Sequence, residues 1–344
     1  MNLVASAIGI VERTPLPDSI TRVGIDLLVG QSRRQREAAP AAEERAFAEA
    51  MSRYPIAVHA EAANRQHYEL PPAFFALTLG PRRKYSCCLY ENEGTSLDEA
   101  ETRALQETAA HADLADGQRI LELGCGWGSL TLFMAERYPA ATITAASNSN
   151  AQRRHIEAEA AARGLPNITV ITADMNDFAP TGTFDRVVSV EMFEHMANWR
   201  SLLGRIRTWL TPQGRVFVHV FAHQTRPYRF DHRDPADWIA QYFFTGGLMP
   251  SHGLIGRFAD LFTVEREWRW DGRHYQRTAL DWLANFDARR PAIDRVLTET
   301  YGNEARLWAR RWRLFFLATA GLFGYRDGSE WGVSHYRLRP AGEA

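Results

Sequence analysis

The chain has 344 residues, of which 45% are hydrophobic and 24% are charged, and these proportions are typical of a soluble globular protein. Its formal net charge of −1 gives no overall field that would recruit nucleic acid or an anionic membrane, and its three cysteines are too few for a disulfide framework. Because no His/Cys cluster has metal-ligand spacing and no apolar run reaches about 18 residues, we expect a cytoplasmic protein with no metal and no stable membrane association.

Residues 1–65 are predicted to form an N-terminal helical segment that precedes the main domain, residues 66–344. The stretch 37–50 is rich in Ala and Glu, which favour helix. Within 18–33, one helical face is apolar and consists of Ile20, Val23, Leu27 and Leu28. We expect this face to pack on the protein's own core, and contact with lipid is the alternative.

From residue 118 onward, strands and helices alternate regularly. The predicted strands are 119–123, 141–147, 168–172, 184–190 and 214–221, and the predicted helices between them are 127–138, 149–163 and 198–210. The sequence Thr211-Pro212-Gln213-Gly214 predicts a turn before the fifth strand. Strands that alternate with helices predict a parallel sheet with helices on both faces, a doubly wound α/β fold.

Residues 222–330 interrupt this alternation. Residues 262–270 alternate like a strand, long helices are predicted over 276–323, and 330–339 reads as a last strand. An insertion after the fifth strand would lie over the carboxyl ends of the sheet, where ligands bind in such folds, so we predict a helical substrate lid. Helix packing explains most of its aromatic residues, and a few are candidates to line a substrate pocket: Trp238, Tyr242, Phe243, Phe244, Trp268, Trp270, Tyr275 and Trp282.

A glycine-rich turn lies in QRILELGCGWGSL, residues 118–130, between the first predicted strand and the helix after it. Gly124 and Gly126 would let a ligand approach the backbone N–H groups. The spacing differs from the G-x-G-x-x-G of dinucleotide binders because Ser129 stands at the third glycine position, and no Asp or Glu follows about 20 residues on. The turn therefore favours the methionine end of S-adenosylmethionine and resembles motif I of the methyltransferases, and a plain βα turn is the alternative.

A cluster of ionisable residues follows the strand FDRVVSV and consists of Glu191, Glu194 and His195. Two acids and a histidine are poor core material at the end of a buried strand. If a helical turn begins there, Glu191 and His195 share one face at i and i+4. An amine is mostly ammonium at neutral pH, so a methyl acceptor of this kind needs a carboxylate or imidazole to bind the cation and accept its proton. The alternative is a helix N-terminal acid with a structural histidine.

Six motifs follow one another along the chain: KYSCCLYENEGTSLDEAE (84–101), LELGCGWGSLTL (121–132), SVEMFEHMANW (189–199), DWIAQYFFTGGLMPS (237–251), WDGRHYQRTALDWL (270–283) and FGYRDGSEWGVSHY (323–336). In sequence and spacing they resemble the cyclopropane-fatty-acid-synthase-like methyltransferases and, within them, the coclaurine N-methyltransferase branch. The resemblance runs from about residue 54 to the C-terminus. It implies a class I, Rossmann-like methyltransferase with a seven-stranded sheet, which uses S-adenosylmethionine and releases S-adenosylhomocysteine.

The resemblance also implies a cofactor site. Gly124 and Gly126 would pass under the methionine part, and neutral groups would take the place of the usual ribose-binding acid. Asp174 would accept from the adenine amine while Met175 packs on the ring, although Met175 alone could be core filler. The expected cofactor-binding residues are Tyr68, Tyr85, Ser86, Glu122, Gly124, Gly126, Ser147, Asn148, Gln152, Asp174, Met175 and Glu191.

Two overlapping sets of catalytic residues follow from the resemblance. In the plant N-methyltransferases, the residues matching Glu191, Glu194 and His195 are assigned to accept the proton. In the cyclopropane synthases, a base is held as bicarbonate by residues that match Cys87, Glu194, His219 and Tyr275. Glu191 discriminates between the N-methyltransferase set and the cyclopropane-synthase set, because cyclopropane synthases carry a small residue at the matching position.

We therefore predict N-methylation of a small-molecule amine with general-base assistance. The alternative is methylation or cyclopropanation of an unsaturated fatty acyl chain, and a cofactor-binding protein without catalysis is a third. A small amine is the expected partner, nucleic acid is not, and a homodimer is left open.

Overall fold

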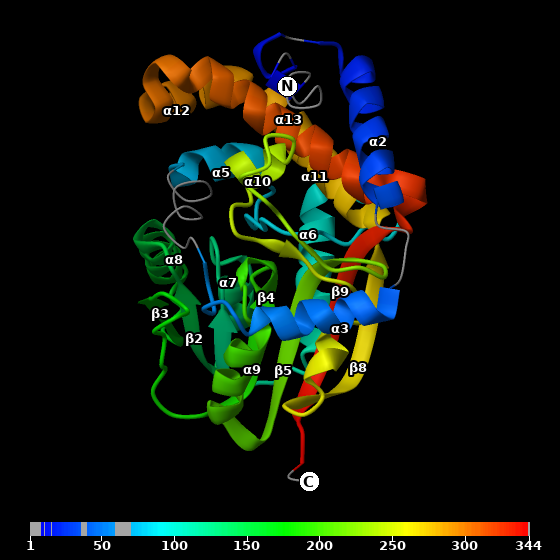
Figure 1. The fold of residues 1–344 in the computed structure, drawn as a ribbon. Helices are drawn as coiled ribbons and strands as arrows, with labels where there is room; N and C mark the ends of the chain where they lie inside the picture. Colours follow the sequence, from blue (N-terminus) through cyan, green and yellow to red (C-terminus); the bar gives the residue numbers. More distant parts are fainter. Residues whose placement is uncertain (1–7, 10, 15, 36–39, 59–69, 343–344) are drawn as a thin grey trace.

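The computed structural model describes residues 8–9, 11–14, 16–35, 40–58 and 70–342. A seven-stranded sheet lies at its centre, with the strand order β3-β2-β1-β4-β5-β9-β8 (Figure 1). Its strands are β1 (Arg119–Leu123), β2 (Thr142–Ser147), β3 (Ile168–Thr172), β4 (Phe184–Val190), β5 (Leu210–His223), β8 (Phe262–Asp271) and β9 (Trp331–Pro340). A separate two-stranded sheet consists of β6 (Tyr228–Arg229) and β7 (Leu248–Met249).

Strands β1 to β5 pair in parallel, whereas β9 runs antiparallel to both of its neighbours, β5 and β8. The predicted doubly wound α/β fold with seven strands is confirmed, with one reversed strand. The reversal follows from the path of the chain. Strand β9 comes directly after the helices at the carboxyl ends of the parallel strands, so it must run back toward their amino ends (Figure 1).

Helices cover both faces of the sheet. On one face lie α6 (Leu97–His111), α7 (Ser129–Arg137) and α8 (Asn150–Arg163). The other face is covered by α9 (Trp199–Thr208), the 3-10 helix η2 (Leu254–Phe258) and α3 (Pro40–Met51). Helix α6 begins with a capping box, in which the side chains of Ser96 and Glu99 each accept the other's backbone N–H. No element is predicted from the sequence in the stretch that holds α6.

A cap of helices lies over the carboxyl ends of the parallel strands (Figure 1). It consists of α5 (Pro72–Thr78), α10 (Trp238–Tyr242), α11 (Gly272–Ala288), α12 (Arg290–Tyr301) and α13 (Ala305–Gly324), with the 3-10 helices η3 (Gly302–Glu304) and η4 (Tyr325–Gly328). Strand β8 divides the insertion after the fifth strand, because α10 precedes β8 whereas α11 to α13 lie between β8 and β9. The helices predicted over 276–323 are these three.

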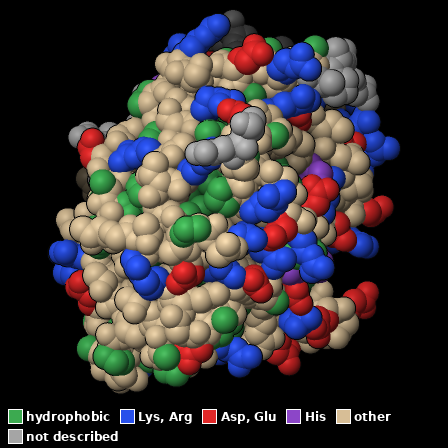
Figure 2. Space-filling view, turned by 90° about the horizontal axis from the view of Figure 1, so that it is seen from below, with side chains coloured by type: hydrophobic (Ala, Val, Ile, Leu, Met, Phe, Trp, Pro, Cys, Tyr) green, Lys and Arg blue, Asp and Glu red, His purple; other side chains and the backbone are tan. Residues whose placement is uncertain are grey.

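Acidic and basic side chains are interspersed on the surface at the lower end of Figure 1, where the C-terminus lies (Figure 2). This face presents no field of a single sign. Within the described part of the chain, no helix is both long and apolar enough to cross a membrane.

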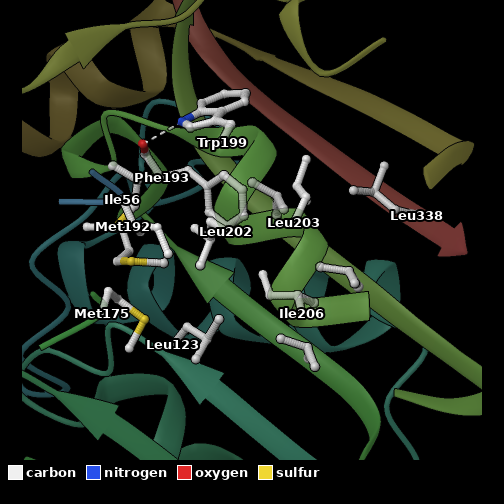
Figure 3. Packing of buried hydrophobic residues seen from close by; sticks show 14 of the residues in the cluster. Ile56, Leu123, Met175, Met192, Phe193, Trp199, Leu202, Leu203, Ile206 and Leu338 are labelled. Carbon is white, nitrogen blue, oxygen red and sulfur yellow. Dashed lines mark hydrogen bonds between the residues drawn. The ribbon is translucent and has the colours of Figure 1, made fainter. Parts of the chain in front are cut away.

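The core between α9 and the sheet fixes the turn that follows β4. Leu202, Leu203 and Ile206 of α9 are fully buried there, beside Leu123 of β1 (Figure 3). The indole N–H of Trp199 donates to the carbonyl oxygen of Phe193 at 2.8 Å (Figure 3). Since both residues are buried, this hydrogen bond anchors the turn to the core.

The expected packing of the first amphipathic face is wrong. In α2 (Asp18–Gln35) the predicted inward residues are exposed: Ile20 by 55%, Val23 by 60%, Leu27 by 66% and Leu28 by 38%. A second face, with Ile25 and Val29, packs on the cap instead. Ile25 fits against Gly321 of α13, where an added Cβ would lie 2.5 Å from its Cγ2. Shape complementarity therefore selects this face, although the other is as apolar.

The predicted turn at 211–214 is a bulge within β5. Phe184 of β4 pairs with Leu210, and Arg186 pairs with Arg215, so the residues between them loop out of the ladder. The Pro-Gln-Gly sequence deflects the chain as expected, but the strand begins before it because Leu210 already pairs.

Gly272 is expected to be essential for joining the sheet to the cap. A Cβ at this position would lie 2.0 Å from the carbonyl oxygen of Phe323 and 2.3 Å from that of Trp331. Gly272→Ala should lower the free energy of unfolding by about 1–3 kcal/mol, because backbone atoms must move. In the control Gly204→Ala, on α9, no atom lies within 4 Å of the added Cβ, so stability should rise by about 0.5–1 kcal/mol. Urea unfolding measures both, and equal shifts would contradict this account.

Candidate active site

The ionisable cluster lies in the turn after β4. Glu191 adopts a left-handed φ of 47°, and Phe193–His195 form the 3-10 helix η1. The predicted placement of Glu191 and His195 on one α-helical face is therefore wrong, because the backbone reverses at Glu191 before the helical turn begins. A non-glycine residue with this φ is uncommon and is found preferentially at functional sites.

The carboxylate of Glu191 contacts three groups from distant segments. Its Oε1 accepts the backbone N–H of Cys87 at 2.9 Å and lies 3.2 Å from Nε2 of His219 on β5. Its Oε2 accepts the hydroxyl of Tyr275, on α11, at 2.7 Å. The two predicted catalytic sets thus meet at this carboxylate. Three hydrogen bonds fix its position.

Opposing effects act on the proton affinity of Glu191. Burial raises its pKa, whereas Lys84 and the hydrogen bonds from Cys87 and Tyr275 lower it. Lys84 is itself buried, and its Nζ donates to Ser86 Oγ at 2.5 Å and to the Cys87 carbonyl at 2.6 Å. Lys84 is not among the residues predicted from the sequence, since a single lysine in a motif does not indicate burial.

Glu194 lies in a different environment. Its side chain is fully buried, and neither carboxyl oxygen has a side-chain hydrogen-bond partner among the residues that the structure describes. Burial and then the neighbouring charge of Glu191 raise its pKa well above the ordinary value, and nearby backbone N–H groups offset this only in part. Its environment therefore favours the protonated form more strongly than that of Glu191, whose carboxylate is hydrogen-bonded.

Two cavities meet at this turn. The first is lined by residues at the ends of β1, β2 and β3, and the second extends toward the cap. The residues that line both cavities are Gly124, Gly126, Gln152, Glu191 and His195. A group bound in one cavity would therefore face a group bound in the other across Glu191 and His195.

The first cavity holds most of the predicted cofactor residues. They are Gly124, Gly126, Ser147, Asn148, Gln152, Asp174, Met175 and Glu191. Gly126 has a φ of 52° and no atom within 4 Å of where a Cβ would lie, so its backbone borders open space. The buried side-chain nitrogen of Gln152 has no partner, while its oxygen accepts the hydroxyl of Ser147 at 2.6 Å. The open space at Gly126 and the side-chain nitrogen of Gln152, which can donate to a ligand, fit a polar molecule such as S-adenosylmethionine.

The second cavity holds the other predicted cofactor residues that can be placed, Tyr85, Ser86 and Glu122. Burial raises the pKa of Glu122 to about 8, although the carboxylate accepts the hydroxyl of Thr131 at 2.6 Å. The remaining predicted residue, Tyr68, lies outside the described residues.

Aromatic rings and acids line the second cavity together. Of the aromatic candidates, Phe244, Tyr275 and Trp282 line it, and Phe315 of α13 adds a ring that was not predicted. The imidazole of His195 stacks on Phe244, with 4.5 Å between ring centroids. Three acids also line this cavity: Glu122, Glu191 and Glu194.

Cys87 and His219 lie behind Glu191 and line neither cavity. Both are fully buried. Burial raises the pKa of the Cys87 thiol well above the ordinary value, so it remains protonated. Cys87 thus contributes its backbone N–H to the site.

Comparison with known proteins shows the family of this chain. The family model described as mycolic acid cyclopropane synthetase matches residues 57–328. The (S)-coclaurine N-methyltransferase of Thalictrum flavum subsp. glaucum is 37% identical over 285 residues, which cover 81% of this chain and 79% of that protein. The chain belongs to this family. The resemblance inferred from the six motifs is confirmed.

A solved relative supports the cofactor assignment. The crystal structure of coclaurine N-methyltransferase bound to N-methylheliamine and S-adenosylhomocysteine (SAH) has a TM-score of 0.91 and 32% identity, and covers 98% of this chain and 99% of that one. The cyclopropane-fatty-acyl-phospholipid synthase of Escherichia coli (strain K12) is 28% identical over 271 residues, which cover 78% of this chain and 66% of that protein. The protein is an S-adenosylmethionine-dependent methyltransferase of the branch that contains the coclaurine N-methyltransferases.

Gly126→Val should abolish binding of S-adenosylmethionine and SAH by this methyltransferase, because the new side chain would fill the open space beside the first cavity. Isothermal titration calorimetry measures the affinity, and NAD should give no heat. Gly302→Val is a matched control, because Gly302 also has a φ of 52° and open space but lies far from both cavities, in η3. Unchanged affinity in Gly126→Val, or an equal loss in Gly302→Val, would refute the placement of the cofactor.

Proposed function

We propose that this methyltransferase transfers a methyl group to the nitrogen of a small amine, with Glu191 as the general base. The observation that carries the proposal is the position of Glu191, a carboxylate fixed by three donors where the two cavities meet. The relative whose structure contains N-methylheliamine, an N-methylated amine, supports this acceptor class.

The lining of the second cavity fits a cationic amine. The carboxylate of Glu191 attracts the ammonium, and the faces of Phe244 and Trp282 offer further attraction to a cation. A protonated amine has no free lone pair, so it must lose a proton before it can react. Glu191 and His195 are the groups that border both cavities and can accept one.

The mechanism assigns different roles to the two acids. S-Adenosylmethionine, when bound, supplies the methyl group from its sulfonium. Glu191 accepts a proton from the ammonium, and the freed lone pair then forms the N–C bond as the S–C bond breaks. The raised pKa of Glu194 favours its protonated form, and an ammonium beside it would favour its ionised form. Environments that give two neighbouring carboxyl groups different pKa values are typical of acid–base sites.

The same contacts argue against the acyl-chain alternative. The resemblance assigns Cys87, His219 and Tyr275 to a bicarbonate pocket, but here all three contact the carboxylate of Glu191. A bicarbonate ion would have to displace this carboxylate or lie beside a like charge, which is unfavourable. The carboxylate of Glu191, a residue of the chain, therefore takes the place of a bound bicarbonate ion as the anionic base.

Glu191→Gln and His195→Ala should each retain SAH affinity and lose turnover by about 10²–10⁴-fold, the usual contribution of a general base. Activity of the parent should rise with pH, because the free amine and the ionised form of Glu191 both increase; burial raises the pKa of Glu191 and moves this rise toward neutral pH. The control is Glu267→Gln, since Glu267 is an exposed acid on β8. If both variants stayed within a few-fold of the parent, water would have to accept the proton.

A direct comparison of acceptors tests the substrate class. One preparation receives methyl-labelled S-adenosylmethionine with either heliamine, the parent amine of N-methylheliamine, or vesicles of unsaturated phospholipid. We expect label in the amine, and no cosedimentation of the protein with the vesicles, because single amphipathic contacts bind membranes only marginally. Label in the lipid fraction, with heliamine and other small secondary amines inert, would establish the acyl-chain alternative.

A further inference from the structure

A row of three histidines connects Glu191 to the protein surface. His219 Nε2 lies 3.2 Å from Glu191 Oε1, and His219 Nδ1 lies 2.9 Å from Nε2 of His335. His335 Nδ1 lies 2.8 Å from Nδ1 of His111, and His111 Nε2 lies 3.1 Å from Oε2 of Glu107. His219 and His335 are fully buried, while the side chains of His111 and Glu107 are 12% and 22% exposed. The row therefore begins at the proposed base and ends at solvent.

The fold itself aligns these rings. His219 on β5 and His335 on β9 are paired directly across the antiparallel ladder. Glu107 and His111 are one turn apart at the end of α6, which covers this face of the sheet. Trp268 of β8 stacks on His111, with 3.8 Å between ring centroids. Three strands and one helix thus hold the row in a fixed geometry.

The number of hydrogens in the row matches the number of contacts. Four contacts join the two carboxyl groups and three imidazoles, and each needs one hydrogen. Three neutral imidazoles supply three, so one further proton completes the row. With this proton on Glu191, each ring donates from the nitrogen nearer the surface. One hydrogen can then shift along each of three contacts, from Glu191 to His219, from His219 to His335 and from His335 to His111. This leaves His111 as an imidazolium paired with Glu107, and no heavy atom has moved.

We infer that this row carries the proton accepted by Glu191 out to the surface at Glu107. The inference rests on the proposed function. Each transfer to a protonated secondary amine forms one N–C bond, breaks one S–C bond and yields a neutral thioether, a protonated N-methyl product and one proton. That proton passes to Glu191 and must leave before the next turnover. His219, His335 and His111 are positioning residues that act through Glu191, since none of them lines either cavity.

The surroundings favour transfer over storage of the proton. Burial lowers the pKa of His219 and His335 well below the ordinary value, and Lys84 and the neighbouring histidines add to this effect. Burial also lowers the pKa of His111, which Glu107 raises and Arg337 lowers. Arg103 pairs with Glu107 at 2.6 Å. An imidazolium is thus unfavourable in the buried part, and Glu107 stabilises one only at the exposed end.

A purely structural role is the competing explanation, because a buried polar network could instead specify the pairing of β9 with β5. A structural role predicts lower stability without a change in the pH profile. The two roles can be separated at His111, which is partly exposed and can be truncated with little effect on the sheet.

The first experiment measures turnover of heliamine by His111→Ala and His335→Gln. We expect kcat to fall about tenfold or more at pH 6–7, with unchanged KM and SAH affinity and with partial recovery at higher pH. Imidazole added to the buffer should restore His111→Ala, because the vacated site reaches solvent. The control is His252→Gln, since His252 contacts Ser334 and Tyr336, the neighbours of His335 in β9, and lies outside the row.

If kcat and its pH profile were unaltered in both His111→Ala and His335→Gln, while the parent still methylated heliamine, the row would not carry the proton. This relay of the proton along the row would then be overturned, and the proposed function would remain intact. If the parent methylated no amine, the proposed function would fail. The relay must then be judged by the second experiment, which needs no substrate.

That experiment follows the ring nitrogens of the unliganded protein by NMR with ¹⁵N-labelled histidine. Above the pKa of Glu191, His219 and His335 should both carry the hydrogen on Nε2. Below it, both should carry the hydrogen on Nδ1 after a single shared transition, and this transition should be absent in Glu191→Gln. Tautomers that are independent of pH, or that change in separate transitions, would refute the relay.

Discussion

The candidate active site depends on one interaction, in which the buried carboxylate of Glu191 contacts three groups from distant segments. Cys87 lies before the sheet in the sequence, His219 lies on β5 and Tyr275 lies on the cap, and all three contact Glu191. The cost of burying a charge is offset only when its hydrogen bonds are made, so the sheet and the cap must be assembled together. The left-handed backbone at Glu191 is followed by a turn that is anchored separately, because the indole of Trp199 on α9 donates to the carbonyl oxygen of Phe193.

This arrangement relates the two chemistries of the family. The resemblance implies a bicarbonate pocket in the cyclopropane synthases. Such a pocket needs the same hydrogen-bond partners that surround Glu191 in this chain. In this chain the carboxylate of Glu191 already contacts Cys87, His219 and Tyr275. Under the proposed function, the base is therefore a residue of the chain itself.

Local features could be predicted from the sequence, whereas long-range contacts could not. The glycine turn around Gly126 and the alternation of strands and helices along the chain follow from short motifs and periodicity, and the six motifs indicate the family. The meeting of Cys87, His219 and Tyr275 at Glu191 depends on how distant segments pack, which spacing does not encode. The same holds for α2, where the fit of Ile25 against Gly321 selects one of two apolar faces. His335 and His111 carry no local signal, since an isolated histidine in a strand or helix resembles any packed residue.

The place of β9 has a consequence for how the protein forms. Strand β9 follows the cap helices in the chain and pairs between β5 and β8, so both strands have an open edge until it is inserted. Open edges are prone to pair with other chains, and a nascent chain would expose two of them while the cap folds. The sheet can close only after α11 to α13 have left room for the returning strand. Completion of the sheet also brings His335 to His219, so the proposed proton path is complete only after β9 has been inserted.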